Sequence, residues 1–500
     1  MVRVTGAAPA VPASGVAVEN AGDIFAAGGT ILLHGELADG LLDTVVNNSG
    51  LLQADGLATN PDGTISLVAN GGDLVVAGTV GAGGGQVVLA SSGHIDLGAT
   101  LVAGALEIGA DSLEQDPGGG AVTVTGTASI QAAGDATFNR GGNDFAGTVD
   151  LAVGGHALLV DANGITLRNV RTADLSVQAN GPITLDGINQ IRGNLALDTG
   201  GGGSITQAGA GASVQVQGRS ELKAGTQDII LHNSPNRFVG TVDLAGRLVE
   251  IRGMDGLSLG ELAVQNLTAS TQGGALSLGR GTIAGNLSAL VSGAAGGDLV
   301  QSGALSVGGT STLQNTGSGN IVLDHVSNDF GGTVHVNMIG GSARLNDAHN
   351  LAVTAVANNL EVTAGGVLDF GSVSLMGNLK AESAAGGIRQ TGAVRVTGTT
   401  RLDAGSASIV LTSPGNDFTG VVELSGGAVS VVDNNSLVLG TIDASSLYAK
   451  GSTIGLSGDV ETTGIQEYDG AVRLEADVAL TAGGHVGFAS TVDGAHQLSV

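Results

Sequence analysis

The residues that could carry out chemistry are few and scattered in this 500-residue chain, which has 45 acidic residues against 18 Lys and Arg. One chemistry open to a repetitive β protein is polysaccharide cleavage. It needs clustered carboxylates with a basic partner, and usually aromatic platforms for the sugar. Here the acids occur singly beside turns, and the only tyrosines are Tyr448 and Tyr468. We therefore expect no catalytic residues and no enzyme activity.

A metal centre is not expected either. The nine histidines include a loose group of His325, His335 and His349, whose spacings of 10 and 14 residues do not place two ligands on one strand face. The chain has no cysteine, so it offers neither thiolate ligands nor disulfides. We predict no metal site and no cofactor.

Weak calcium binding is left open by two glycine-rich pieces. Asn70-Gly71-Gly72-Asp73-Leu74 and Gly141-Gly142-Asn143-Asp144-Phe145 are similar to parts of the calcium-binding nonapeptide. That motif binds calcium when it repeats in tandem, because successive turns then share an ion. Both pieces are isolated here, so they favour turns over a calcium site.

The most specific signal in the sequence is a marker motif, Asn-x-Phe-x-Gly-x-Val, that occurs four times. Its phenylalanines are 93, 92 and 88 residues apart, so the period is near 90. The Asn and Phe positions of the four copies are Asn143 and Phe145, Asn236 and Phe238, Asn328 and Phe330, and Asn416 and Phe418.

Other features recur with the marker. An apolar run precedes three copies, an Asp follows every copy by 17 to 19 residues, and a hydrophobic-x-Gln step recurs three times. The runs are 229–231, 321–323 and 409–411; the acids are Asp161, Asp255, Asp347 and Asp433; the glutamines are Gln207, Gln301 and Gln390. A unit of 90 residues is too long for one supersecondary element, so each must contain several smaller turns.

Two interpretations of the marker are open. In the structural one, each Phe fills a wide part of the core and the preceding Asn turns a corner, since Asn tolerates left-handed backbone and bonds locally. In the functional one, the motif is a surface recognition element. A motif present in every repeat usually serves the stacking of the repeats, which favours the structural interpretation.

Composition and pattern predict an all-β fold. Glycine contributes 88 residues and aromatics 2%, so the core must be thin and made of small branched side chains. Short apolar alternations such as Val122-Thr123-Val124 predict strands, and no capped amphipathic helix is found. A sandwich and a propeller are the alternatives, but propeller blades would repeat every 40–50 residues or so.

We therefore predict a right-handed parallel β-helix, a solenoid that is elongated and nearly helix-free. Coils of roughly 20 residues would give roughly 20–25 coils and a length of roughly 100–120 Å at about 4.8 Å per coil. Residues 1–15 are expected to be a flexible lead or a truncated end, and 16–142 the first part of the β-helix. Residues 143–500 should form four super-repeats: 143–235, 236–327, 328–415 and 416–500.

The net charge of the chain limits the classes of partner that it is expected to bind. A formal net charge of −27 would repel a phosphate backbone, so nucleic acid is not an expected partner. No apolar run is long enough to span a bilayer, and the start of the chain lacks the apolar segment of a signal peptide. The absence of cysteine suits a polypeptide that crosses a periplasm unfolded.

Two passages resemble the large exoproteins of the filamentous haemagglutinin family. One runs from Gly28-Gly29-Thr30-Ile31-Leu32-Leu33 through Asp43-Thr44-Val45-Val46-Asn47-Asn48-Ser49-Gly50 to Ala54; the other is Thr462–Val472 with Gly487–Ala495. The marker is similar to that family's shaft repeats, so the resemblance covers nearly the whole chain after residue 16. It implies a right-handed β-helix exported by two-partner secretion through an outer-membrane transporter, with adhesion as the usual role.

The expected function is thus the structural and adhesive shaft of a secreted bacterial surface exoprotein that attaches to a host glycan or receptor. The alternative is a passive spacer in a toxin-delivery exoprotein, and a polysaccharide-degrading enzyme is a third class. The family's secretion domain, through which the transporter would act, does not appear in this sequence. We therefore expect an internal fragment, or a reading frame that has lost its start.

Overall fold

The computed structural model describes residues 2–7, 15–36, 44–54, 63–293 and 296–500. These residues form strands and turns, and none of them forms a helix. Strands pair in parallel with the strands of neighbouring coils, and about 22 turns stack in the described parts of the chain. The parallel β-helix with almost no helix is therefore confirmed. No helix among the described residues is long and apolar enough to cross a membrane.

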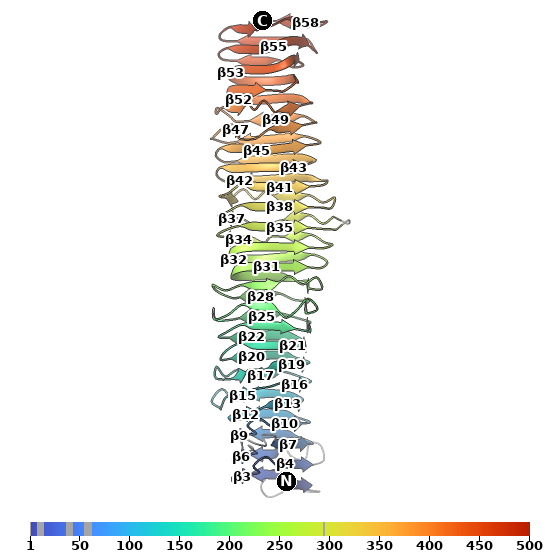
Figure 1. Ribbon diagram of the computed structural model, residues 1–500, viewed down its shortest axis with the longest axis vertical. Helices are drawn as coiled ribbons and strands as arrows, with labels where there is room; N and C mark the ends of the chain where they lie inside the picture. Colours follow the sequence, from blue (N-terminus) through green and yellow to red (C-terminus); the bar gives the residue numbers. More distant parts are fainter. Residues whose placement is uncertain (1, 8–14, 37–43, 55–62, 294–295) are drawn as a thin grey trace. The chain divides into compact units, whose positions relative to one another are not determined.

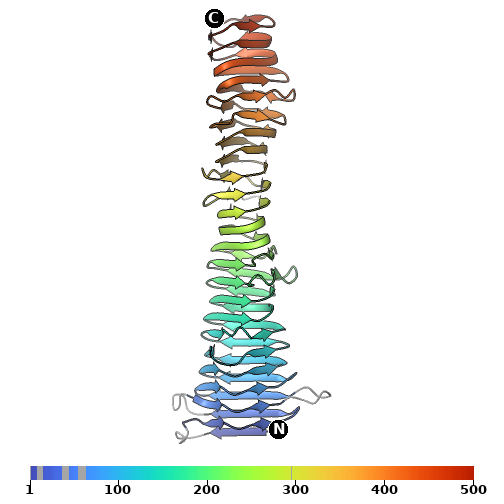
Figure 2. The ribbon, with the colours of Figure 1, turned by 90° about the vertical axis from the view of Figure 1, so that its left-hand side faces the viewer.

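The chain divides into two compact units, Met1–Gly253 and Met254–Val500. Within each unit the strands of successive coils lie one above another (Figures 1 and 2). The division falls inside the expected super-repeat 236–327, so the units do not coincide with the sequence repeats.

The first unit has three columns of stacked strands. The first column is β1 (Val2–Ala7), β4 (Thr30–Glu36), β7 (Thr64–Asn70), β10 (Gln86–Ser91), β13 (Ala105–Ala110), β16 (Ala128–Ala132), β19 (Thr148–Val153) and β21 (Ile165–Thr172). The second is β2 (Val18–Asn20), β5 (Thr44–Asn48), β8 (Asp73–Val76), β11 (His94–Leu97), β14 (Ser112–Gln115), β17 (Ala136–Phe138), β20 (His156–Asp161), β22 (Asp174–Ala179), β25 (Leu195–Asp198), β28 (Ser220–Lys223) and the start of β31 (Thr241–Gly253). The third is β3 (Ile24–Phe25), β6 (Leu52–Gln53), β9 (Val80–Gly81), β12 (Leu101–Ala103), β15 (Val122–Val124) and β18 (Asp144–Phe145).

Above β21 the first column divides into two. Its first half continues as β23 (Ile183–Asp186), β26 (Ile205–Gln207) and β29 (Ile229–Leu231), and its second half as β24 (Ile188–Ile191), β27 (Ser213–Val216) and β30 (Arg237–Phe238).

The second unit repeats this plan. It begins with β32 (Leu257–Thr271), on which all three columns start. One column is β33 (Leu276–Ser277), β36 (Leu299–Val300), β39 (Ile321–Leu323), β42 (Ser342–Asp347), β44 (Asn359–Ala364), β46 (Leu379–Ser383), β49 (Thr400–Asp403) and β52 (Val421–Val432). The next is β34 (Arg280–Ile283), β37 (Leu305–Val307) and β40 (Asp329–Phe330). The last is β35 (Leu287–Val291), β38 (Ser311–Asn315), β41 (Val334–Met338), β43 (Leu351–Ala357) and β45 (Leu368–Leu375).

Above β45 the last column divides as it does above β21. One branch is β47 (Ile388–Gln390) and β50 (Ile409–Leu411), and the other is β48 (Val394–Val396) and β51 (Asp417–Phe418). The final strands are β53 (Ser436–Leu456), β54 (Val460–Thr462), β55 (Gln466–Leu474), β56 (Val478–Ala482), β57 (Val486–Phe488), β58 (Val492–Gly494) and β59 (Leu498–Ser499).

Because a column divides, successive markers within a unit lie on different sides of the coil. In the second unit β40 carries Phe330, yet Phe418 in β51 stacks on the column of β41, the strand that follows β40. In the first unit Phe238 in β30 likewise stacks on the column of β19, the strand that follows β18. Consecutive markers within a unit therefore lie on neighbouring sides of a three-sided coil.

Alternating side chains explain why these segments are strands. In β4 and β7 every second residue points into the core, and Ile31, Leu33, Ile65 and Leu67 are buried. Such a period of two is the pattern of a strand with one buried face. Small aliphatic side chains fill the narrow interior, as the composition predicted.

The expected flexible lead over residues 1–15 is wrong for residues 2–7, which form β1 and pair in parallel with β4. The physical reason is the alternation of Val2 and Val4, which continues the column that Ile31 and Leu33 extend. Residues 8–14 of that lead, and residues 37–43 of the first passage that carries the family resemblance, lie outside the described residues.

Candidate functional site

The marker asparagine forms a buried amide pair with a glutamine from the preceding coil. In the fourth copy Gln390 Nε2 donates to Asn416 Oδ1 at 2.8 Å, and Asn416 Nδ2 donates back to Gln390 Oε1 at 2.9 Å. Asn416 Oδ1 also accepts the Val394 N–H at 2.9 Å, and Nδ2 donates to Leu411 O at 3.1 Å. All hydrogen-bonding groups of this fully buried side chain are thus satisfied inside the chain.

The same pair occurs in every copy. The reciprocal distances from Gln to Asn and from Asn to Gln are 2.8 and 2.9 Å for Gln115 and Asn143, 2.8 and 2.9 Å for Gln207 and Asn236, and 2.7 and 2.9 Å for Gln301 and Asn328. The recurring hydrophobic-x-Gln step therefore supplies the partner of the marker. In the first copy that partner is Gln115, which sequence reasoning missed although it lies 28 residues before Asn143, within the spacing of the other copies.

The apolar run before the marker belongs to the same corner. Its last carbonyl accepts a hydrogen bond from the marker Asn in three copies: Leu231 at 2.9 Å, Leu323 at 3.1 Å and Leu411 at 3.1 Å. The Asn therefore holds its own chain and the coil below in one network, and buried amides satisfied in this way specify one register.

The four marker phenylalanines point into the core. Phe145, Phe330 and Phe418 are at most 1% exposed and Phe238 is 4% exposed. Phe145 also meets the ring of Phe138 edge to face, with centroids 5.5 Å apart. This burial is what the structural interpretation of the marker requires.

The aspartate that follows the marker caps it from the next coil. Asp161 Oδ2 accepts the Phe145 N–H at 2.8 Å, Asp347 Oδ2 the Phe330 N–H at 2.6 Å, and Asp433 Oδ2 the Phe418 N–H at 2.7 Å. The other carboxylate oxygen accepts the N–H two residues later, at Asn163, His349 and Asn435. Because no strand stacks above the marker Phe at these three corners, the carboxylate takes the place of a ladder hydrogen bond.

Burial raises the pKa of Asp161, Asp347 and Asp433 above the ordinary value of 3.8, although the two N–H donors of each oppose the shift. A raised folded-state pKa stabilises the fold fully below 3.8, and this contribution is lost as the pH rises through the folded-state pKa. The corner acids therefore favour a mildly acidic medium.

Replacing Asp347 by Asn is expected to destabilise the second unit most at acidic pH. The penalty should shrink as the pH rises towards neutrality, because only the wild-type side chain loses its contribution over that range. Denaturant unfolding of both proteins across this pH range measures the penalty. A penalty that stays constant or grows with pH would contradict the assignment.

The marker glycine allows neighbouring coils to approach. A Cβ added at Gly147, Gly240, Gly332 or Gly420 would lie closer than 3.0 Å to the backbone of a glycine in the preceding coil. For Gly332 the hypothetical Cβ would lie 2.6 Å from the carbonyl carbon of Gly309. The glycine of the marker is therefore set by this close backbone contact.

Replacing Gly332 by Ala is expected to destabilise the second unit by about 1–3 kcal/mol, because the backbone of one coil must shift to admit the methyl group. Gly141→Ala is the matched control, since an added Cβ there meets nothing within 4 Å. Equal unfolding midpoints for the two variants in a denaturant titration would show that the coil contact is not tight.

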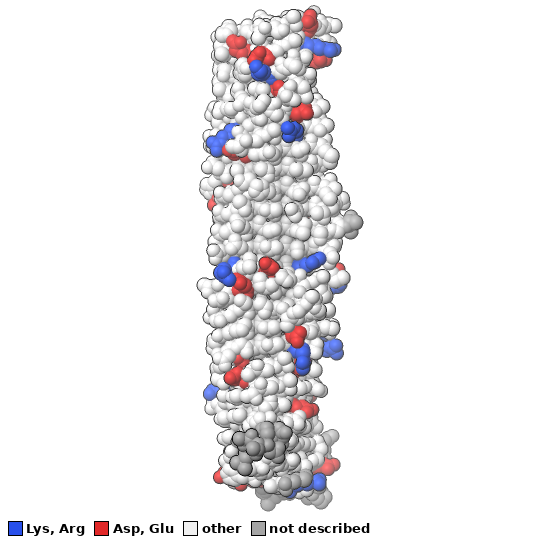
Figure 3. Space-filling model, viewed as in Figure 1, with Lys and Arg blue, Asp and Glu red and all other residues white. Residues whose placement is uncertain are grey.

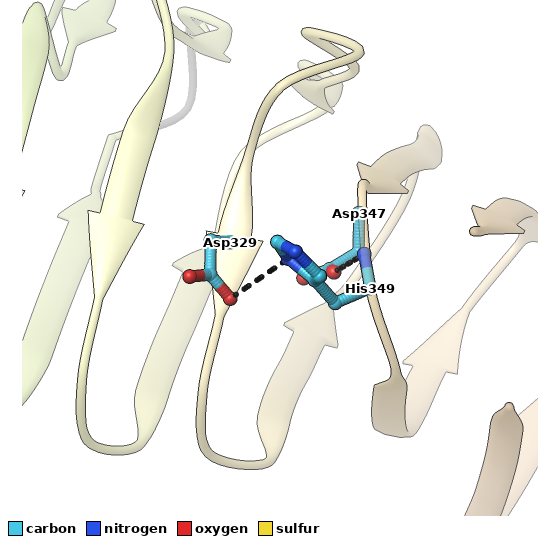
Figure 4. Close-up of side chains that lie close together, drawn as sticks. All are labelled: Asp329, Asp347 and His349. Atoms are coloured by element: carbon cyan, nitrogen blue, oxygen red, sulfur yellow. Dashed lines mark hydrogen bonds and ion pairs between the residues drawn. The ribbon is translucent and has the colours of Figure 1, made fainter. Parts of the chain in front are cut away.

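One group of side chains has the composition of a metal site. Single ligand atoms of Asp329, Asp347 and His349 lie within 4.8 Å of one another (Figure 4). His349 Nδ1 is 3.5 Å from Asp329 Oδ1, while both oxygens of Asp347 already accept backbone N–H groups.

Two other corners use the same positions without histidine. The place of His349 is taken by Asn163 beside Asp161 and by Asn435 beside Asp433, and Asn435 Nδ2 lies 3.4 Å from Asp417 Oδ1. His349 thus contacts Asp329, the residue between the marker Asn and Phe, as Asn435 contacts Asp417. The geometry is that of a repeated corner, and it favours a structural role over metal binding.

The other predicted candidates do not come together into a site. His335 Nδ1 lies 2.8 Å from Thr354 Oγ1, and His325 Nδ1 accepts the Ser327 N–H at 3.1 Å, so each bonds to a different neighbour from His349. In the calcium-like pieces, Asn143 Oδ1 is used by Gln115 and Val122, and Asp73 Oδ1 accepts the His94 N–H.

A polar groove lies over β42, β44 and β46, with a cavity volume of about 470 Å³. Glu361 lines the groove and accepts hydrogen bonds from Lys380 at 2.9 Å and Arg344 at 3.0 Å, and these contacts lower the pKa of its carboxyl group. The carboxylate is therefore held ionised between two cations. Glu361 is the carboxylate among the residues that line the groove.

A family model matches much of the chain. A family model described as "Repeats of unknown function (DUF5649)" matches residues 84–152, 154–206, 190–245, 264–337 and 357–425, which is more than half of the chain. Four of these stretches end seven residues after a marker Phe, so the family's repeat has the same phase as the corner described above. Comparison with curated proteins and with solved structures found no significant match.

Proposed function

Because the chain belongs to the family described as repeats of unknown function (DUF5649), we propose that it is the structural and adhesive shaft of a secreted bacterial surface exoprotein. The observation that carries this proposal is the repeated corner. Its Asn, Gln and Asp bond coil to coil, and its Phe fills the core. Recurring polar residues that hold successive coils together are typical of a structural repeat protein that presents an extended surface.

The adhesive and secreted parts of the proposal are supported by the resemblance of residues 28–54 and 462–495 to filamentous haemagglutinin-like exoproteins. On this proposal the protein is exported by a two-partner secretion transporter in the outer membrane. It then attaches the cell to a host glycan or receptor.

We also propose that the protein is not an enzyme. Support comes from the pairing of its surface charges. Arg168 with Asp150, Arg389 with Asp369 and Lys450 with Asp469 are ion pairs between neighbouring coils. Several basic side chains lie beside acidic ones on the face shown in Figure 3. Such pairs use these carboxylates to hold neighbouring coils together, whereas a catalytic acid or base must be placed to exchange a proton with a substrate.

A passive spacer is the second candidate, and the sameness of the corners favours it. The four amide pairs have nearly the same distances, so this part of the corner is constant from one super-repeat to the next. A spacer needs only this regularity. An adhesive shaft needs in addition an exposed site on one or more coils.

Two measurements test the proposal. Mass spectrometry of culture supernatant, outer membrane and cytoplasm should find peptides of this chain outside the cell. Purified protein coupled to beads should then retain the beads on host-cell layers, whereas beads with an unrelated acidic protein should not be retained. Peptides confined to the cytoplasm would contradict the secreted shaft, and extracellular protein without attachment would favour the spacer.

A further inference from the structure

Tyr448 is an exposed aromatic residue on a chain that has very few. It lies on β53 and is 36% exposed, whereas Tyr468 on the neighbouring β55 is 1% exposed. Among the described residues Phe25 is the other aromatic side chain exposed to this degree. An exposed aromatic ring on a sheet surface gives up favourable burial.

The ring of Tyr448 is held in place by the next coil. Its hydroxyl donates to Asp469 Oδ2 at 3.0 Å, and Lys450 Nζ donates to the same oxygen at 2.7 Å. These contacts from Lys450 and Tyr448 lower the pKa of the Asp469 carboxyl group, which stays ionised. A ring fixed in this way loses little conformational entropy when a ligand packs on it.

A second pair of polar groups lies along the same column. In register, Ser430, Tyr448, Glu467 and Gly487 follow one another from coil to coil. Glu467 Oε1 lies 2.6 Å from His485 Nε2. A Cβ at residue 487 would lie 2.5 Å from Glu467 Oε2, so the glycine leaves the space that this carboxylate occupies.

The four polar side chains around the ring remain open to solvent. The exposed fraction of the side chain is 39% for Glu467 and 43% for Asp469, with Lys450 and His485 more exposed still. An aromatic face is thus bordered by two carboxylates that can accept hydroxyl hydrogens and by two nitrogen donors. The patch sets two carboxylates against one lysine and one histidine, so it carries no net positive charge and gives no strong attraction to an anion.

We propose that this patch, formed by Tyr448, Lys450, Glu467, Asp469 and His485, binds a pyranose unit of a neutral glycan. A pyranose has an apolar C–H face that packs on the Tyr448 ring and a rim of hydroxyls that bond to the surrounding carboxylates and nitrogens. The proposal deepens the adhesive role and rests on it, since it names the ligand class through which the shaft would attach.

A purely structural interpretation of the same residues makes a different prediction. If the contacts only staple β53 to β55, the ring has no ligand, and removing it changes stability alone. Exposed ion pairs of this kind contribute little to stability.

The test is binding of the full chain to an array of neutral and acidic glycans, followed by saturation-transfer NMR with the strongest neutral binder. Neutral glycans are expected to bind, with transfer to their C–H protons. Tyr448→Ala should lower the affinity at least about tenfold. Tyr448→Phe, which keeps the ring, should retain most of the binding. Ser430→Ala, in the same column, is the matched control and should bind like the wild type.

Unfolding midpoints of all variants show whether Tyr448→Ala still folds. If Tyr448→Ala does not fold, Tyr448→Phe still tests the site, because the ring alone should preserve binding. No neutral glycan bound, or equal binding by folded Tyr448→Ala, would overturn the site. Attachment of wild-type beads to host cells without glycan binding would overturn the site and leave the adhesive shaft standing.

Discussion

Replacing Phe330 by Ala is expected to lower the free energy of unfolding of the second unit by about 3–5 kcal/mol. The ring is 1% exposed and lies in β40, whose neighbours below are β37 and β34. Truncation leaves a cavity that the coil cannot close, because the Gly332 backbone is already in close contact with the coil below. The loss of buried area and the cavity then add to each other.

The measurement is denaturant unfolding of the wild type and variant, with hydrogen exchange to locate the change. Val326→Ala is the matched control, since Val326 lies four residues earlier and is 72% exposed. We expect the control to change stability by less than about 0.5 kcal/mol. A Phe330→Ala variant as stable as this control, with lost binding to cells instead, would show that the marker is a recognition motif.

Replacing Asn416 by Ala is expected to destabilise the second unit by at least about 3 kcal/mol. The change removes the partner of the Gln390 amide, of the Val394 N–H and of the Leu411 carbonyl. Each buried group left without a partner costs about 1–3 kcal/mol, and the Asn416 side chain that bonds to these groups is 0% exposed.

A double-mutant cycle separates the pair from its surroundings. Gln390→Ala and Asn416→Ala together should cost clearly less than the sum of the two single changes, because either one already breaks the amide pair. Asn434→Ala, at an exposed asparagine nearby, is the control and should be close to neutral. Additive penalties for Gln390 and Asn416 would contradict a direct, reciprocal pair.

The sequence allowed the repeats and the fold to be predicted because their signals are local. The marker phenylalanines, the period near 90 and the alternation of small apolar residues need no knowledge of which coils touch. The recurring Gln and Asp could also be found, but not what they bond to. Gln390 and Asn416 are 26 residues apart, more than one coil, so their contact depends on register that only the structure gives.

Other features could not be predicted for the same reason. Tyr448 and Asp469 lie side by side because β53 pairs with β55. The group of Asp329, Asp347 and His349 likewise depends on which coils are neighbours. The division of columns above β21 and β45 arises where one long strand is followed by two short ones. Amino-acid composition does not reveal where a column divides.

The division of a column above β21 and above β45 affects which side of the coil carries the marker. Because the marker moves to the next side of the coil from one super-repeat to the next, groups attached to successive markers within a unit face different directions. Within each unit the two repeated corners therefore lie on neighbouring sides of the coil rather than along one face.

The central claim is that the marker bonds coil to coil, and hydrogen exchange of single amides in the full chain tests it most directly. The N–H groups of Leu305, Val394 and Phe330 bond to the side chains of Asn328, Asn416 and Asp347. The account predicts that they exchange as slowly as the amides of the surrounding strand ladders. Exchange as fast as in the exposed turns, while the ladders stay protected, would contradict it.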